Sequence, residues 1–133
     1  MEVLQTTREV IADKIRTRTA KVGVIGLGYV GLPLAVEFAN AGFSVTGIDV
    51  QATKVDGLNA GCSYIQDVPG DVVQKHVDSG RLNATTDFAV ITELDTVNIA
   101  VPTPLRKTKD PDMSFVLAAA EQVAKYIHPG LLV

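Results

Sequence analysis

The segment Gly26–Gly31, which reads GLGYVG, has the residue types and spacing to hold a pyrophosphate. Gly26 permits a tight turn, Gly28 leaves room for a phosphate to approach the backbone, and Gly31 lets a following helix pack close to a preceding strand. The free N–H groups and the positive dipole end of that helix would face the phosphates. The segment therefore predicts a phosphate-binding turn between a strand and a helix.

Asp49 completes the pattern, because it ends a second apolar run roughly 20 residues after the glycines. Its carboxylate can accept hydrogen bonds from both hydroxyls of an adenosine ribose and would repel a 2′-phosphate. The combination predicts a site for NAD rather than NADP. The alternative is a glycine-rich turn that binds no ligand, and the flanking strand, helix and acidic residue argue against it.

Alternating strands and helices are expected to position these residues. An amphipathic helix over Val3–Arg18, with Leu4, Ile11 and Ile15 on one face, comes first. We predict strands over 21–25, 44–49, 82–85 and 96–101, and helices over 30–41, 52–59, 70–78 and 114–127; Thr86 or Asp87 caps a brief helix through Thr92, and 131–133 opens another strand. This order predicts an α/β, Rossmann-type parallel sheet with helices on both faces. Residues 1–20 are expected to be a helical extension, and 21–133 an incomplete dinucleotide-binding domain.

The composition excludes several classes of function. The chain has 133 residues, 47% of them hydrophobic, a net charge of −3 and one cysteine. Because it has no basic stripe and few aromatic residues, we expect no nucleic-acid partner. The apolar stretch 22–36 is too short and too interrupted by glycine to cross a membrane. The single cysteine fits a reducing cytoplasm, and no residue spacing indicates a metal site.

Further motifs resemble the UDP-glucose/GDP-mannose dehydrogenase family over residues 21–133. These are the run Val22–Ala35, the segment VTGID that ends at Asp49, Lys54-Val55 with Leu58-Asn59 and Gly61, the segment Gly80–Asp87, and VPTPL at 101–105 followed by Pro111-Asp112. The VPTPL form is most similar to the branch that oxidises UDP-N-acetylhexosamines. The resemblance implies a UDP-sugar substrate, two NAD-linked oxidations at C6 to the uronic acid, and a full-length protein that is a homo-oligomer.

The resemblance also implies roles for individual residues. Tyr29 and Val30 would contact the cofactor within the glycine segment, and Lys54 would help at the ribose or else be a solvated helix lysine. Pro102 and Thr103 would approach the cofactor near its ribose or nicotinamide side. The cysteine nucleophile of the family and its lysine and asparagine helpers belong to later parts of such enzymes. No catalytic residue is therefore expected here, and the fragment alone should be inactive.

Other residues with reactive or charged side chains receive plainer interpretations. Cys62 is expected to be a buried or incidental thiol, and His76 and His128 to lie on a surface helix and at a helix end without an acid–base partner. Tyr64 and Phe115 are expected to pack in the core or a lid. Arg106, Lys107 and Lys109 either attract a diphosphate or form a solvated loop. Two alternative functions stay open: the cofactor domain of another NAD-linked hydroxy-acid dehydrogenase, and a non-catalytic NAD-binding module.

Overall fold

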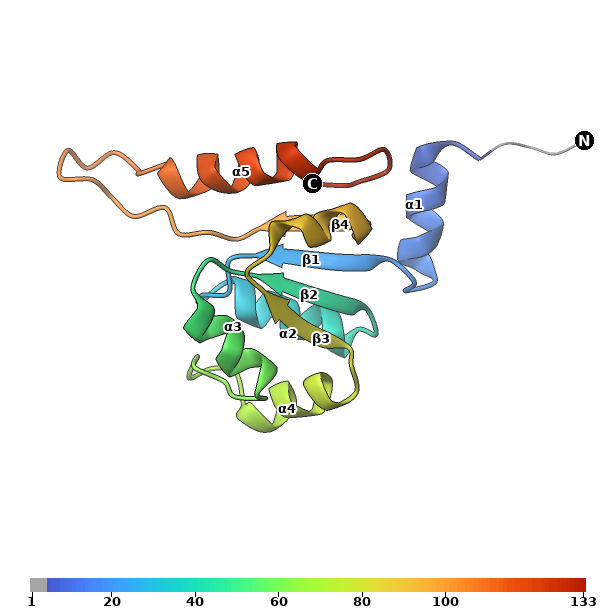
Figure 1. Cartoon of the computed structure of the whole chain (residues 1–133), viewed down its shortest axis with the longest axis horizontal. Coiled ribbons are helices and arrows are strands. Elements are labelled where there is room, and N and C mark those ends of the chain that lie inside the picture. The colour runs from blue at the N-terminus through green and yellow to red at the C-terminus, as the bar shows by residue number, and fades with distance from the viewer. Residues whose placement is uncertain (1–4) are drawn as a thin grey trace, which may run out of the picture.

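A parallel four-stranded sheet forms the centre of the computed structural model, which describes residues 5–133. The strands lie in the order β3 (Leu82–Thr85), β2 (Ser44–Ile48), β1 (Lys21–Ile25) and β4 (Thr96–Ile99) (Figure 1). Leu132 adds an isolated parallel bridge to Thr96 on the far side of β4. The predicted strands are thus present, and 131–133 begins to pair where a further strand was expected.

Helices cover both faces of this sheet and enclose two separate apolar clusters (Figure 1). One face carries α2 (Gly31–Asn40), α3 (Ala52–Asn59) and α4 (Gly70–Asp78), and the other carries α5 (Ser114–Tyr126) and the 3-10 helix η1 (Phe88–Glu93). The apolar positions of β1 alternate between the two clusters, with Val22 and Val24 in the first and Ile25 in the second. The Rossmann-type α/β fold predicted from the sequence is therefore confirmed.

Several predicted elements are longer than the observed ones, the last strand and the first helix among them. The strand expected to reach Val101 ends at Ile99, because β1, the strand with which it pairs, ends at Ile25, the partner of Ile99. The first helix, α1, runs only from Thr7 to Arg16. Its start is fixed by a capping box, in which Thr6 accepts from the Glu9 N–H and Glu9 accepts from the Thr6 N–H. Val3 and Leu4, assigned to the apolar face of this helix, lie outside the described residues.

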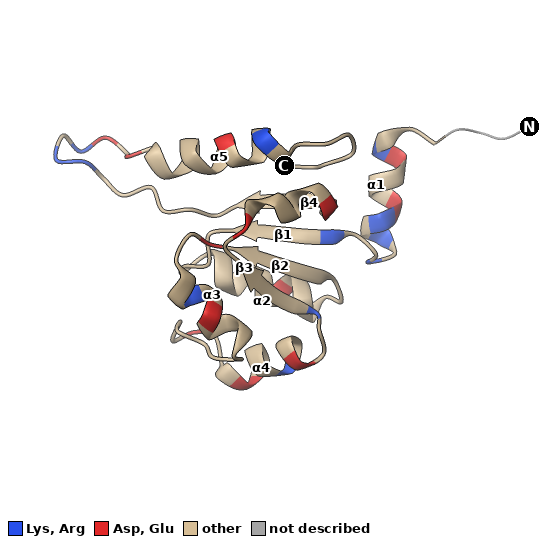
Figure 2. Ribbon diagram, in the orientation of Figure 1, with Lys and Arg blue, Asp and Glu red and all other residues tan. Residues whose placement is uncertain are grey.

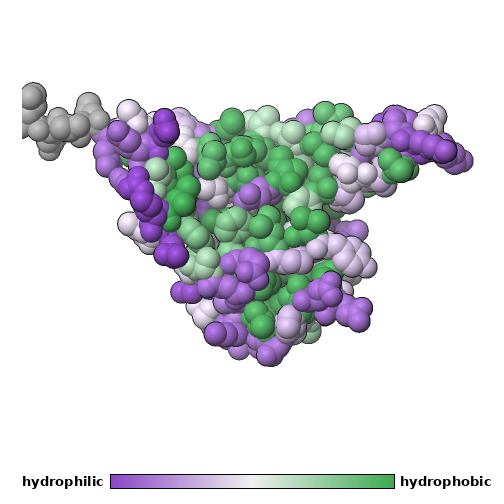
Figure 3. All heavy atoms as spheres, turned by 180° about the vertical axis from the view of Figure 1, so that it is seen from behind, coloured by the Kyte–Doolittle hydropathy of each residue, from purple (hydrophilic) through white to green (hydrophobic). Residues whose placement is uncertain are grey.

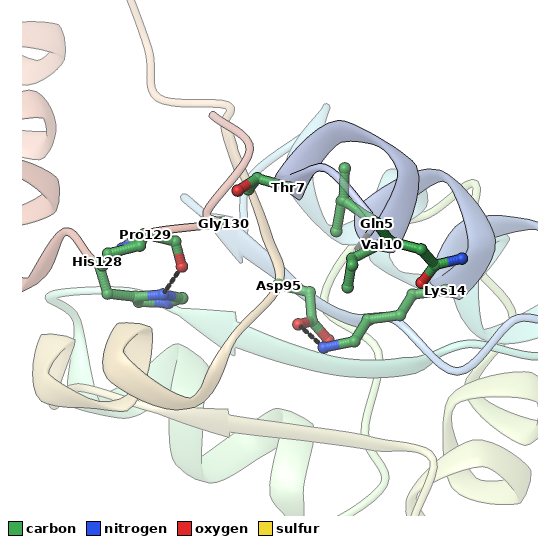
Figure 4. Close-up of a pocket in the computed structure, with 9 residues that line it drawn as sticks. Gln5, Thr7, Val10, Lys14, Asp95, His128, Pro129 and Gly130 are labelled. Atoms are coloured by element: carbon green, nitrogen blue, oxygen red, sulfur yellow. Dashed lines mark hydrogen bonds and ion pairs between the residues drawn. The ribbon is translucent and has the colours of Figure 1, made fainter. Parts of the chain in front are cut away.

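The helix α1 stands beside the sheet rather than in its core. None of its residues is buried, and Ile15 is half-exposed. A pocket of about 380 Å³ separates the helix from Asp95 and the turn His128–Gly130 (Figure 4). Across this pocket Lys14 Nζ bonds Asp95 Oδ1 at 2.9 Å. The amphipathic pattern therefore predicted a helix here, but among the described residues it is joined to the sheet region by the Lys14–Asp95 ion pair and not by extensive apolar packing.

Asp95 is expected to make a pH-dependent contribution to stability. Burial raises the pKa of its carboxyl, but the Lys21 N–H and the Lys14 ammonium outweigh this and hold the pKa below its ordinary value. Because the folded pKa is lowered, the stabilisation is present above the unfolded pKa of about 4 and is lost as the pH falls through the folded value. Asp95→Asn should lower the free energy of unfolding at pH 7 by on the order of 1 kcal/mol, since Lys14 is partly exposed.

Urea unfolding between pH 2.5 and 7 would check this expectation. The difference between the unsubstituted protein and Asp95→Asn should shrink as the pH falls below about 4. Asp13→Asn is the control, because its pair with Arg16 is far more exposed and should contribute little. A difference that stays constant down to the lowest pH would contradict the assignment.

Apolar side chains remain exposed on α5 and on the segment after it. Seen from behind, a broad hydrophobic area crosses the molecule (Figure 3). Exposed apolar side chains on α5 and the segment after it include Phe115, Leu117, Ile127 and Leu132, which are all at least 47% exposed. Phe115 lies in the first turn of α5 and is 47% exposed, so it does not pack in the core, and the alternative that it packs in a lid stays a prediction. No helix of residues 5–133 is long and apolar enough to cross a membrane.

Candidate dinucleotide-binding site

The residues singled out in the sequence come together at the carboxyl edge of the sheet. Gly26 follows β1 and Asp49 follows β2, while Pro102 and Thr103 lie in the exposed segment after β4. The backbone of Gly26 lies directly against the backbone of Ala100, since a Cβ built on Gly26 would meet that residue's carbonyl group. Parallel strands place their carboxyl ends at one edge, which is where open α/β sheets bind ligands.

Three glycines in the turn have three different surroundings. Gly26 has φ of 94°, a left-handed conformation that disfavours other residues. A Cβ on Gly31 would overlap the carbonyl oxygen of Gly26, so helix and turn approach as closely as the backbone allows. A Cβ on Gly28, in contrast, would meet nothing within 4 Å. The fold therefore needs Gly26 and Gly31, whereas the bare backbone at Gly28 faces open space.

The turn also contains backbone donors without partners. Within the part of the chain that the structure describes, the N–H groups of Gly28, Tyr29, Val30 and Gly31 have no hydrogen-bond acceptor. The helix α2 that they open has Val30 at its N-cap, without a side-chain cap. Four unsatisfied N–H groups at the positive end of a helix form a place where an anion is stabilised.

Asp49 lies beside this turn and is already oriented by the backbone. Its side chain is buried, with Oδ2 accepting from the Leu27 N–H at 2.9 Å and Oδ1 accepting from the Gln51 N–H at 2.8 Å. Each carboxylate oxygen can accept a further hydrogen bond. The next residue, Val50, is 77% exposed and adds an apolar surface. The carboxylate is thus fixed next to the glycine turn, and its oxygens can accept further hydrogen bonds.

Tyr64 is a contact of this turn that sequence reasoning missed. It was assigned to core or lid packing, but its hydroxyl donates to the Leu27 carbonyl at 2.5 Å. Partial burial, and then the nearby Asp49 carboxylate, raise the pKa of its phenol to about 12. The two residues are 37 positions apart, in the glycine turn and in the segment between α3 and α4, and no local pattern links them.

The other predicted site residues lie on or near the turn, and their side chains make no hydrogen bond in the described chain that indicates a role. Tyr29 and Val30 are 85% and 68% exposed, which is unusual for apolar side chains beside a buried strand. Lys54 is half-buried in the first turn of α3. Pro102 and Thr103 are exposed after β4. Nothing in the structure tests whether these residues contact a cofactor, so their roles stay predictions.

Several other candidates have ordinary structural surroundings. Cys62 is exposed, so the part of the expectation that made it buried is not met. His76 is buried and not on the surface, because Asn40 Oδ1 lies 2.6 Å from its Nε2 and ties α4 to α2. His128 Nε2 contacts the carbonyl oxygens of Ile91 and Leu94. No cluster of metal-ligating side chains occurs among residues 5–133.

The basic cluster after β4 is paired within its own loop only at Arg106. Arg106 faces the carboxylates of Asp110 and Asp112 at 4.0 and 3.6 Å. Lys107 and Lys109 are exposed at the tip of the loop, which projects past the first turn of α5 (Figure 2). This arrangement favours the solvated loop over a diphosphate-attracting patch.

Comparison with known proteins identifies the group to which this fold and site belong. Residues 20–133 match the family model of the UDP-glucose/GDP-mannose dehydrogenase family, NAD binding domain. A relative from Salmonella typhi, UDP-N-acetyl-D-mannosamine dehydrogenase, is 43% identical over 113 residues, which are 84% of this chain and 26% of that protein. The chain therefore spans about a quarter of the length of this relative.

Solved structures agree with the sequence comparison. NDP-N-acetyl-D-galactosaminuronic acid dehydrogenase from Methanosarcina mazei Go1 superimposes with a TM-score of 0.82 at 34% identity, covering 98% of this chain and 30% of that one. In contrast, (S)-3-hydroxybutyryl-CoA dehydrogenase from Ralstonia eutropha, with a TM-score of 0.58 and 16% identity over 84% of this chain and 38% of that one, shares the fold alone. The chain belongs to the UDP-glucose/GDP-mannose dehydrogenase family, of which it is the NAD-binding domain.

Proposed function

We propose that this domain holds NAD on the turn Gly26–Gly31 and on Asp49, within a protein that oxidises C6 of a UDP-sugar to the uronic acid in two NAD-dependent steps. The observation that carries the proposal is that a buried carboxylate, Asp49, is bonded to the turn whose four N–H groups are unsatisfied. The N–H groups stabilise the pyrophosphate, and the carboxylate takes the hydroxyls of the adenosine ribose. When bound, NAD supplies the hydride acceptor.

The exposed side chains around the glycine turn and Asp49 fit further parts of the cofactor. Tyr29 and Val30 flank the pyrophosphate position, and Val50 offers an apolar surface beside the ribose. Lys54 reaches the ribose from α3, while Pro102 and Thr103 border the nicotinamide side. The two prolines at 102 and 104 stiffen this border, because their φ angles are fixed and they lack N–H groups.

The substrate of the protein is a UDP-N-acetylhexosamine, either UDP-N-acetylglucosamine or UDP-N-acetylmannosamine. The name of the Salmonella relative and the VPTPL segment support this choice. We assign no catalytic residue to this chain, which accounts for 26% of that relative's length. The exposed apolar side of α5 supports a role as one part of a larger assembly, and we propose a homo-oligomer of the full-length protein.

An NADH absorbance assay on the full-length protein tests the proposed reaction. UDP-N-acetylmannosamine and UDP-N-acetylglucosamine are offered in turn, with UDP-glucose and a 3-hydroxy acid for comparison. Two NADH per sugar oxidised support the proposal, since alcohol becomes aldehyde and then acid. Turnover of the hydroxy acid with none of the UDP-sugars would overturn it in favour of the hydroxy-acid alternative.

Asp49 should determine the choice of cofactor. The unsubstituted protein should bind NAD at least about tenfold more tightly than NADP, or about 1.4 kcal/mol, because a 2′-phosphate would meet the buried carboxylate. Asp49→Asn should weaken NAD binding and narrow this preference, since it removes the charge while keeping the side-chain shape. Calorimetric titration with both cofactors measures this. Equal affinities in the unsubstituted protein would contradict the assignment.

A further inference from the structure

The Leu27 residue of the glycine turn is held on three sides. Its N–H donates to Asp49 Oδ2 at 2.9 Å, and its carbonyl accepts from the Tyr64 hydroxyl at 2.5 Å. Its side chain is fully buried and lies against Gly47 of β2, where an added Cβ would clash with it. Two of these three contacts come from β2 and the residue after it, and the third comes from a distant segment. Among the described residues, Tyr64 is thus the residue that bonds the Leu27 carbonyl, and it lies outside both the glycine turn and β2.

The direction of the Leu27 carbonyl determines the direction of a phosphate-facing donor. The Leu27 carbonyl and the Gly28 N–H belong to one planar trans peptide unit and therefore point in opposite directions. The same carbonyl lies four residues before the Gly31 N–H, the position from which a regular helix would draw an acceptor for that donor. In the described chain this carbonyl accepts from the phenol, and the Gly31 N–H has no acceptor.

We propose that Tyr64 is a positioning residue for NAD: its hydroxyl holds the Leu27–Gly28 peptide so that the N–H groups of the turn face the pyrophosphate. This inference rests on the proposed site and adds to it a residue outside the glycine motif. It also gives the segment between α3 and α4 a function in cofactor binding.

The surroundings of Tyr64 suit this task. Its neighbour Ile65 and the nearby Val68 are buried in the same apolar cluster as Leu27, which anchors the segment that carries the phenol. Ser63 Oγ closes the local turn by donating to the Ile65 carbonyl at 3.0 Å. The pKa of the phenol, raised to about 12, keeps the hydroxyl protonated, and so a donor, at neutral pH.

The test is Tyr64→Phe, which removes the hydroxyl and keeps the ring. In the full-length protein, titration should show NAD binding about threefold to tenfold weaker, the effect of losing one ordinary hydrogen bond. Tyr126→Phe is the matched control, because that half-buried phenol lies on α5 at the other cluster and should leave the affinity unchanged. Unchanged NAD affinity in Tyr64→Phe, in a protein that binds NAD, would overturn the proposal.

Hydrogen exchange without cofactor separates positioning from general stability. Peptides that contain 27–30 should exchange faster in Tyr64→Phe, because the Leu27 N–H loses a constraint on its bond to Asp49, while peptides from β1 and β4 stay unchanged. Faster exchange spread over the whole sheet would assign the phenol a purely structural role and overturn the proposal. If the unsubstituted protein fails to bind NAD, the proposed function fails, and this exchange comparison alone decides whether Tyr64 holds the turn.

Discussion

Gly28→Val should abolish measurable NAD binding while the domain stays folded. An added side chain at Gly28 meets no protein atom within 4 Å, and the φ of this residue is not in the left-handed region, so the fold accommodates it. In the proposed site, the pyrophosphate lies in this space, next to the four unsatisfied N–H groups of the turn. A branched side chain there excludes a pyrophosphate from van der Waals contact with the backbone. We expect the affinity to fall by at least about a hundredfold, or roughly 2.7 kcal/mol.

Calorimetric titration with NAD, together with urea unfolding, measures both halves of this expectation. The free energy of unfolding should change by less than about 1 kcal/mol, as for a surface substitution. Gly57→Val is the matched control, because a Cβ at Gly57 on α3 also meets nothing within 4 Å but lies outside the glycine turn. This control should bind NAD normally. Undiminished NAD binding by Gly28→Val would show that the phosphates lie elsewhere.

Local signals were sufficient to predict most of the elements that carry the site. The bounds of α3 and α4 agree with the prediction because glycine stop signals follow each helix: Gly61 and Gly80 have φ of 80° and 75°. Asp87, one of the two residues predicted as the cap, caps η1 through the Ala89 N–H. Such features depend on the conformations that one or two residues can adopt, so they can be predicted from the local sequence.

Features that depend on a distant neighbour could not be predicted in this way. The end of β4 is set by the length of β1, and the burial of His76 is set by Asn40 on another helix. The same holds for the site, where the glycines and Asp49 are visible as a spaced motif but the Tyr64 contact is not. A hydrogen bond between segments 37 residues apart leaves no periodicity or spacing in the sequence, and only the fold brings its partners together.

Gly31→Ala should instead destabilise the domain, although it adds only one methyl group. The new Cβ would overlap the carbonyl oxygen of Gly26, which is backbone and not the flexible end of a side chain. Gly26 cannot retreat, because its own backbone lies against Ala100 and its φ of 94° already fixes the turn. The helix α2 must therefore move away from β1, which loosens the buried packing of Leu32 and Ala35. We expect a loss of at least about 3 kcal/mol in the free energy of unfolding, at the upper end for overpacking.

Gly28→Ala is the matched control for Gly31→Ala. It adds the same methyl group three residues earlier in the same turn, where no atom lies within 4 Å, and should change the free energy of unfolding by less than about 0.5 kcal/mol. Urea unfolding of both variants, followed by circular dichroism, measures the difference. Equal midpoints would show that α2 can shift without cost and would contradict the close approach of helix and strand. A large loss in the free energy of unfolding in Gly31→Ala alone would show that the two glycines have separate roles. Gly31 would be needed for the packing of the helix, and Gly28 would be left free for the approach of the cofactor.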